Sequence, residues 1–240
     1  MLTSLIWASV VLALVVVILV IIKVGNRYNG ANWGHPGTNI LDGWIRLYCQ
    51  KFHRQRLQKI SVPDLPRLLL ASNHLSAIDP FLLITATDRP IRFMIAKEEY
   101  DKPFLNRMFK AAGCIPVDRT GRVEKAFRSA LRAINSGELV ALFPQGGIHC
   151  DETPRLRIKP GMAKLSLLSD CAIIPVRING ISAPGTMLAS IITRSTISFD
   201  VGPLVSSQQA QSEQFRKTIS AWFLGEAEQL IIDDSTVSYS

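Results

Sequence analysis

Cysteine and histidine are scarce in this chain of 240 residues, and neither is spaced as a metal site requires. The four cysteines are scattered without the close pairs of zinc sites or disulfide frameworks: Cys49, Cys114, Cys150 and Cys171. The histidines His35, His53 and His149 likewise lack metal-ligand spacing. We therefore expect reduced thiols, no bound metal and no cofactor.

Several common signatures are also absent. The stretch Gly180-Ile181-Ser182-Ala183-Pro184 departs from the Gly-x-Ser-x-Gly nucleophile elbow at its last position. No glycine-rich turn leads into Gly-Lys-Ser/Thr, so there is no P-loop. The sequence contains no internal repeat, no low-complexity segment and no nucleic-acid-binding motif. These absences argue against a serine hydrolase of that type, a P-loop NTPase and a nucleic-acid partner.

Charge is missing from the first 22 residues. Leu2 to Ile22 contains no charged residue and no proline. At about 1.5 Å per residue this segment is roughly 31 Å long, enough to cross a bilayer core of about 30 Å. A cleaved signal peptide would have a basic start, a shorter apolar core and a small-x-small cleavage site. The sequence therefore favours a transmembrane anchor over residues 1–22.

Acidic residues are nearly absent after the anchor. Asp42 is the single acid before Ile60, against seven bases: Lys23, Arg27, Arg46, Lys51, Arg54, Arg56 and Lys59. Positive flanks favour the cytoplasmic side of a membrane, so we expect the domain that follows the anchor to face the cytoplasm. The net charge of +8 fits a membrane partner with anionic lipids, where each nearby Lys or Arg contributes about 1 kcal/mol.

Residues 23–60 connect the anchor to the rest of the chain. Residues 23–40 are rich in Gly and Asn and predict a linker. Leu41 to Ile60 predicts a basic amphipathic helix with an apolar stripe formed by Leu41, Trp44, Ile45, Tyr48 and Phe52. Such a helix lies in the lipid interface or packs on the protein core, and the pattern leaves both interpretations open.

Residues 61–240 predict one α/β domain. Strands are expected at Leu68–Ala71, Ile91–Ala96, Cys114–Val117, Glu138–Phe143, Ala172–Arg177 and Ser195–Val201. Helices are expected at Pro80–Thr87, Pro103–Ala112, Arg122–Asn135 and Pro160–Ser169, with a last one within Gln208–Ile232. This alternation implies a mixed, largely parallel sheet flanked by helices.

His74 and Asp79 form the first candidate site, where an apolar strand gives way to a helix. Ser76 and Asp79 fit a capping-box-like start, with Ser76 as N-cap. Side chains lean toward the N-terminus of a helix, so the Asp79 carboxylate would point at the loop that carries His74. It would then bind Nδ1–H and leave Nε2 as a general base. The alternative is that Asp79 before Pro80 is only a helix cap.

Two further loops could hold an anion. Paired glycines in Phe143-Pro144-Gln145-Gly146-Gly147-Ile148 let backbone amides approach a ligand closely, and the bases Arg155, Arg157 and Lys159 follow. Arg119 comes just after a predicted strand, where a guanidinium grips a phosphate well. The alternatives are an ordinary surface loop for the glycines and, for Arg119, an ion pair with Asp118 or another surface residue, which by itself is the more common case.

Taken together, the segments resemble the 1-acyl-sn-glycerol-3-phosphate acyltransferase family. His74 and Asp79 match its His-x4-Asp signature, and the other blocks follow in the family's order. Those blocks are Phe93-Met94-Ile95-Ala96-Lys97, Ile115-Pro116-Val117-Asp118-Arg119, Phe143-Pro144-Gln145-Gly146, Lys159-Pro160-Gly161 and Ile174-Pro175-Val176. The resemblance covers roughly residues 65–205 and implies a glycerolipid acyltransferase-type fold.

The resemblance also implies a reaction. His74 would take a proton from a glycerol hydroxyl that attacks the thioester of acyl-CoA or acyl-carrier protein, making phosphatidate. Asp79 would orient His74, and Arg119 would grip the acceptor phosphate, with Gly146, Gln145 and Lys97 nearby. The lipid acceptor and the acyl donor are then the implied partners.

The chain departs from the family in one loop. Gln145, Gly147 and Ile148 stand where the family has Glu, Thr and Arg. The departure leaves open another lysolipid or lipid alcohol as acceptor, and also a catalytically silent lipid-binding protein.

Overall fold

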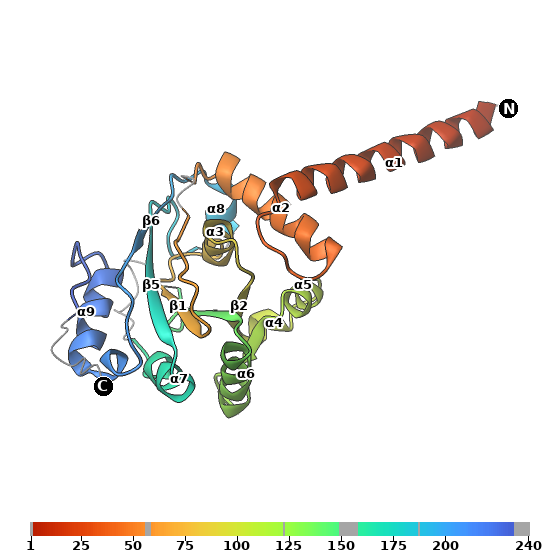
Figure 1. The fold of residues 1–240 in the computed structure, drawn as a ribbon. Helices are drawn as coiled ribbons and strands as arrows, with labels where there is room; N and C mark the ends of the chain where they lie inside the picture. The colour runs from red at the N-terminus through yellow and green to blue at the C-terminus, as the bar shows by residue number, and fades with distance from the viewer. Residues whose placement is uncertain (1, 56–58, 122, 149–157, 187, 233–240) are drawn as a thin grey trace.

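A computed structural model describes residues 2–55, 59–121, 123–148, 158–186 and 188–232. An open sheet lies at the centre of the domain (Figure 1). Its six strands lie in the order β3-β2-β4-β1-β5-β6. Their bounds are β1 Leu68–Ser72, β2 Ile91–Ala96, β3 Ile115–Val117, β4 Leu139–Leu142, β5 Ala172–Asn179 and β6 Ser198–Val201. Strands β1 to β5 pair in parallel, and β6 pairs antiparallel with β5. The predicted mixed, largely parallel α/β fold is confirmed.

Helices of the described residues flank this sheet, apart from α1, which projects away from it (Figure 1). They are α1 Leu2–Tyr28, α2 Pro36–Lys51, α3 Asp79–Ala86, α4 Lys97–Tyr100, α5 Leu105–Ala111, α6 Val123–Asn135, α7 Gly161–Ser169, α8 Leu188–Ile192 and α9 Glu213–Phe223, with a 3-10 turn at Gln209–Gln211. The apolar periodicity predicted α3, α5, α6 and α7 to within two residues. It missed α4 and α8, which have four and five residues and are too short for a periodic pattern.

Alternating strand residues divide the core into two layers. Leu68 and Leu70 of β1 pack with α3, whereas Leu69 and Ala71 pack with α6, α7 and α9. Because both faces of β1 are covered, all five of its residues are buried, and this explains why its sequence is an apolar run without polar alternation.

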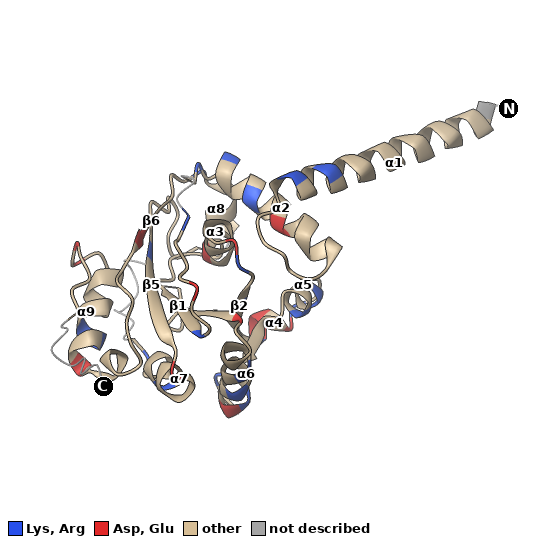
Figure 2. Ribbon diagram, viewed as in Figure 1, with Lys and Arg blue, Asp and Glu red and all other residues tan. Residues whose placement is uncertain are grey.

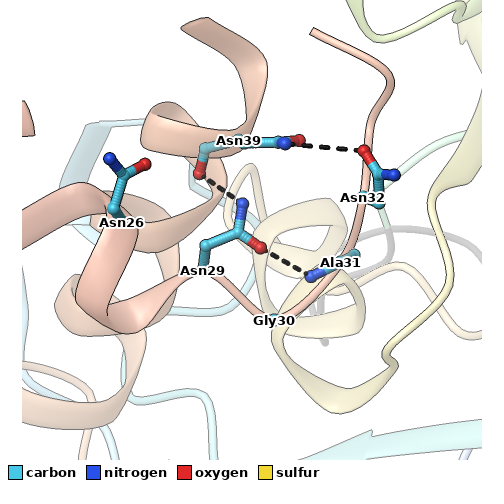
Figure 3. A pocket seen from close by; sticks show the side chains of 6 residues that line it. All are labelled: Asn26, Asn29, Gly30, Ala31, Asn32 and Asn39. Carbon is cyan, nitrogen blue, oxygen red and sulfur yellow. Dashed lines mark hydrogen bonds between the residues drawn. The ribbon is translucent and has the colours of Figure 1, made fainter. Parts of the chain in front are cut away.

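The helices between the anchor and the domain have other bounds than predicted: α2 runs over Pro36–Lys51 and not over Leu41–Ile60. Helix α1 continues to Tyr28 and α2 begins at Pro36, so the expected linker over residues 23–40 shrinks to residues 29–35. Asparagine amides tie this turn together around a small hollow (Figure 3): Asn29 Nδ2 donates to Asn39 O at 2.9 Å, and Asn29 Oδ1 accepts from Ala31 N at 3.0 Å. Gly and Asn thus build a specific turn here instead of a loose connection.

Helix α1 projects away from the rest of the molecule (Figure 1). The segment Thr3–Tyr28 is long and apolar enough to cross a membrane, and none of its most apolar window is buried in protein. It is therefore a candidate membrane span, as the sequence predicted.

The apolar stripe of α2 packs on the core only in part. Ile45 and Tyr48 pack against the core, whereas Leu41 and Trp44 stay 38% and 37% exposed. The fully buried side of the helix instead carries an ion pair between Arg46 Nε and Asp42 Oδ2 at 2.7 Å. This burial of a basic residue was not predicted, because the charged residues were expected to lie off the buried face.

Candidate active site

The predicted site residues gather along one edge of the sheet. Parallel strands place their carboxyl ends at the same edge, where the switch in strand order opens a site for ligands. His74 follows β1, Lys97 follows β2, Arg119 follows β3, and Gln145 and Gly146 follow β4. Because β4 is the direct neighbour of β1, its loop lies closest to His74. Arg119 is three strands away, roughly 14 Å at the usual strand spacing of about 4.8 Å.

The His74–Asp79 contact that the spacing predicted is present. His74 Nδ1 lies 2.8 Å from Asp79 Oδ2. The same oxygen accepts the backbone N–H groups of Leu75 at 2.6 Å and Ser76 at 2.9 Å, and Asp79 Oδ1 accepts the Ser76 hydroxyl at 2.6 Å. The Asp79 side chain is completely buried, so these four donors take the place of water around its charge.

This arrangement fixes the imidazole tautomer. An acceptor-only carboxylate beside Nδ1 requires the ring proton on Nδ1, which leaves the lone pair on Nε2. The His74 side chain is 19% exposed, and within the described parts of the chain no group bonds Nε2. Nε2 is therefore the atom available to a substrate.

The helix start differs from the predicted capping box. Helix α3 begins at Asp79, and Ile78 occupies the N-cap position without a side-chain cap. Ser76 does not act as the N-cap, because its hydroxyl donates to the Asp79 carboxylate instead of accepting a helix N–H. Asp79 is thus no simple cap: its carboxylate organises the loop that carries His74.

Phe143 is a neighbour of His74 that the sequence analysis did not single out for this contact. Its ring stacks on the imidazole, with centroids 4.1 Å apart and planes inclined by 14°. Leu142 pairs with Ala71 in the sheet, so the residue after β4 lies beside the residues that lead to His74. An aromatic residue at the end of the neighbouring strand was the available signal, but only the strand order makes β4 and β1 neighbours.

Gln145 holds the backbone of His74. The residue is 2% exposed, and its Oε1 accepts the His74 N–H at 3.0 Å. Sequence reasoning placed Gln145 against the substrate, whereas the structure turns its carbonyl oxygen toward the loop of the candidate base. The β4 loop therefore restrains His74 twice, through Phe143 on the ring and Gln145 on the backbone.

Gly146, in the same loop, lies beside the cation of Lys159. Its φ of +76° favours glycine, and a Cβ added there would lie 2.4 Å from Lys159 Nζ. Lys159 N also donates to Pro144 O at 2.9 Å. The Lys159 ammonium thus lies over Gly146, near the end of β4. Arg155 and Arg157, the other two expected bases, lie outside the described residues.

Lys97 and Arg119 are both about half exposed and both have acidic neighbours. Lys97 Nζ contacts Asp101 Oδ2 at 2.7 Å, and this hydrogen bond raises the pKa of the lysine. Arg119 Nη1 lies 3.6 Å from Glu98 Oε1. Solvent and salt screen exposed pairs of this kind, so either cation can exchange its carboxylate for a phosphate at little cost.

Three of the four cysteines are free and buried: Cys49, Cys114 and Cys171. Burial raises the pKa of Cys49 to about 12 and that of Cys114 to about 11. Thiols in such apolar surroundings are poor nucleophiles. Cys150 lies outside the described residues, as does His149.

The acyltransferase family model matches residues 54–179, which is more than half of the chain and spans His74, Asp79, Arg119 and Gln145. The chain belongs to the acyltransferase family. This match confirms the family that the ordered sequence blocks resemble.

Individual relatives within the family agree with this assignment. The chain is 30% identical over 165 residues to a probable 1-acyl-sn-glycerol-3-phosphate acyltransferase of Mycoplasma genitalium, covering 64% of the chain and 61% of that protein. It is 28% identical over 124 residues to an N-acylphosphatidylethanolamine synthase of Arabidopsis thaliana, covering 48% of the chain and 43% of that protein. These matches span about half the length of the two relatives.

A solved structure shows the same acyltransferase fold. The 1-acyl-sn-glycerophosphate acyltransferase PlsC of Thermotoga maritima aligns over 80% of this chain and 81% of its own, with a TM-score of 0.60 and 18% identity. The glycerolipid acyltransferase-type fold expected from the resemblance is therefore confirmed.

Proposed function

We propose that the chain transfers a fatty acyl group from acyl-CoA or acyl-carrier protein to the sn-2 hydroxyl of 1-acyl-glycerol-3-phosphate, making phosphatidate for phospholipid biosynthesis. The observation that carries this proposal is the His74–Asp79 pair at the sheet edge, with Nδ1 bound at 2.8 Å and Nε2 not bonded by any residue that the structure describes. A base of this kind suits a hydroxyl nucleophile.

In the proposed reaction, His74 Nε2 accepts the proton of the acceptor hydroxyl while that oxygen attacks the thioester carbonyl carbon. The carbon–sulfur bond then breaks, and the thiolate that leaves takes the proton back from Nε2. Asp79 stabilises the imidazolium that exists between these two steps. Because the thioester is already activated, no covalent acyl-enzyme is needed, in keeping with the buried thiols.

Three cations are available to the acceptor phosphate in this proposal. Lys97 and Arg119 stand half-exposed at the ends of β2 and β3, and Lys159 lies over Gly146. Lys159 supplies positive charge where the chain has Ile148 in place of the family's Arg. An ammonium is a point charge and lacks the two-pronged grip of a guanidinium, so it holds the phosphate with less geometric selectivity.

The altered loop favours an alternative acceptor, which is another lysolipid or a lipid alcohol. Gln145 is committed to the His74 backbone, and Gly147 and Ile148 offer neither a hydroxyl nor a guanidinium. The relatives also differ in acceptor, since the Arabidopsis protein is named for a product acylated on nitrogen.

We also propose a topology in which α1 spans the membrane and the domain lies on its cytoplasmic face. Lys23 and Arg27 flank the apolar part of α1 on the side of the domain. Figure 2 shows basic residues at this base of α1 and along α2. Positive charge at this position is the pattern of a cytoplasmic flank.

The function is tested with purified full-length protein in detergent, labelled acyl-CoA or acyl-carrier protein, and lysophosphatidate beside other lysolipids. We expect transfer to lysophosphatidate, and His74→Ala should lower kcat by about 10² to 10⁴. His35→Ala, on the exposed turn before α2, is the matched control and should remain active.

Each other outcome has a distinct meaning. Transfer that His74→Ala retains would contradict the assignment of the base. Transfer only to acceptors without a phosphate monoester would contradict the phosphatidate proposal. It would support another lysolipid or a lipid alcohol as the acceptor. Absence of transfer to every acceptor from either donor would favour a silent lipid-binding protein.

A further inference from the structure

Helix α8 exposes an apolar face. Leu188 is 77% exposed, Ile192 is 75% exposed, and Ile191 between them is 36% exposed. Residues three and four apart share one side of a helix, so these side chains form a single patch. Large aliphatic side chains grouped in this way usually mark an interaction surface.

The neighbours of α8 place this patch beside the anchor. The Tyr48 hydroxyl of α2 donates to Ile191 O, and Arg194 Nε donates to Phe52 O at 3.0 Å, just past the end of α2. Helix α2 in turn contacts α1, where Trp44 Nε1 donates to Ile21 O at 3.1 Å. Figure 1 likewise shows α8 at the end of the molecule from which α1 leaves.

The charge around α8 suits an anionic surface. Lys51, Arg54 and Arg194 are exposed next to the C-terminal end of α2. In the described part of residues 23–60, the acid Asp42 is buried and paired with Arg46. An apolar patch bordered by uncompensated bases is the pattern of a segment that lies in the lipid interface.

The segment before α8 reaches the candidate active site. Gly185 N donates to Leu75 O at 2.8 Å, and Leu75 is the residue after His74. A surface that fixes α8 against lipid would therefore also fix the orientation of the sheet edge that carries His74.

We propose that the face of α8 formed by Leu188, Ile191 and Ile192 inserts into the lipid leaflet beside α1, as a second membrane contact. Helix α1 alone leaves the tilt of the domain against the bilayer unset, whereas two contacts fix which edge faces the lipid. The orienting role of α8 toward His74 rests on the proposed acyl transfer; the insertion itself does not.

The test measures how deeply α8 lies in the bilayer. The full chain is reconstituted in nanodiscs of phosphatidylcholine and phosphatidylglycerol. A fluorescent label is attached to Leu188→Cys or Ile192→Cys in a Cys150→Ser background, since Cys49, Cys114 and Cys171 are buried. Leu168→Cys is the matched control, because Leu168 is 57% exposed on α7, at the opposite end of the molecule in Figure 1. Doxyl-labelled lipid reports contact with the leaflet, and iodide reports contact with water.

We expect doxyl lipid to quench the labels on α8 at least about threefold more than the label at Leu168, with the reverse order for iodide. Equal iodide quenching at both places would overturn the proposal. So would protection of the α8 labels from both quenchers together with crosslinking between chains, which would identify a protein interface.

An activity measurement separates this proposal from the proposed function. The double variant Leu188→Asp, Ile192→Asp should lose doxyl quenching and turn over vesicle-embedded lysolipid more slowly, while keeping its rate on detergent-dispersed lysolipid. If the unmodified chain transfers no acyl group, the proposed function fails, but the quenching result still decides the insertion of α8.

Discussion

His74 is restrained on its ring nitrogen by α3, and on its ring face and its backbone by the loop after β4. Asp79 takes Nδ1, Phe143 stacks on the ring and Gln145 accepts the backbone N–H. A base held in one rotamer and one tautomer presents Nε2 in a fixed direction, which lowers the cost of bringing it to a substrate. Gln145 thereby acts as a positioning residue in the proposed mechanism.

Replacement of Asp79 by Asn tests the orienting carboxylate. The amide removes the charge that stabilises the imidazolium and offers N–H groups where Oδ2 accepts three bonds, so we expect kcat to fall by about 10² or more. Stability should also drop by about 1–3 kcal/mol, because buried N–H groups lose their acceptor. Steady-state kinetics and thermal unfolding measure the two effects. A variant within twofold of the parent kcat would contradict the orienting role.

Replacement of Gly146 by Ala tests the left-handed turn of the β4 loop. A Cβ at φ +76° strains the backbone and meets the Lys159 ammonium at 2.4 Å, so we expect a loss of about 1–2 kcal/mol in the free energy of unfolding. Gly161→Ala is the control, because a Cβ there meets nothing within 4 Å. The two variants are compared by chemical denaturation, and equal stabilities would contradict the strain argument.

Among the elements, α3 links the N-terminal helices to the site. Asp79 is its first residue, and Arg46 of α2 bonds to carbonyls at its other end: Nη1 to Thr85 O at 3.2 Å and Nη2 to Thr87 O at 2.8 Å. The guanidinium complements the negative end of the α3 dipole and is itself neutralised by Asp42. A shift of α2 would therefore also displace α3, the helix that begins with Asp79.

Arg46→Ala should destabilise the fold strongly. It leaves the buried Asp42 carboxylate without its cation and two carbonyls without their donors, a loss of about 3–5 kcal/mol. Lys217→Ala is the control, since its pair with Glu213 is 71% exposed on both sides and should leave the stability nearly unchanged. Thermal unfolding in detergent compares them. Similar melting temperatures would show that the buried pair is not a structural link.

At the scale of the whole molecule, buried thiols lower the free energy of unfolding as the pH becomes alkaline. The folded pKa values of Cys49 and Cys114, about 12 and about 11, are raised by burial above the ordinary value of 9.0. The unfolded chain therefore loses thiol protons first as pH rises. The thiols' contribution is complete below pH 9, declines above it, and is lost once the pH passes the folded values.

We expect the melting temperature to fall steadily between pH 9 and pH 11, by the equivalent of about 1–2 kcal/mol for each buried thiol. The Cys49→Ala variant should start from a lower stability at pH 8 and show a shallower decline. Differential scanning calorimetry of both proteins over this range gives the comparison. Parallel curves for parent and variant would contradict a contribution from Cys49.

Much of this molecule follows from sequence patterns with local causes. The buried strands and the helices α3, α5, α6 and α7 each depend on residues near one another in the chain, which is why their bounds were predicted closely. The helix expected at Leu41–Ile60 is the exception, because α2 runs over Pro36–Lys51. The His74–Asp79 contact belongs to the same group, because its partners are five residues apart and the start of α3 orients the carboxylate. Membership of the acyltransferase family follows from ordered blocks along the chain.

Tertiary structure alone decided the contacts between distant segments. Phe143 and Gln145 reach His74 because β4 lies beside β1, and a strand order of β3-β2-β4-β1-β5-β6 cannot be read from any single strand. The burial of Arg46 depends on where α2 lies against the end of α3. A guanidinium expected at the surface therefore joins α2 to α3 inside the protein. Local periodicity determines which elements form, whereas the packing of their faces determines which side chains meet.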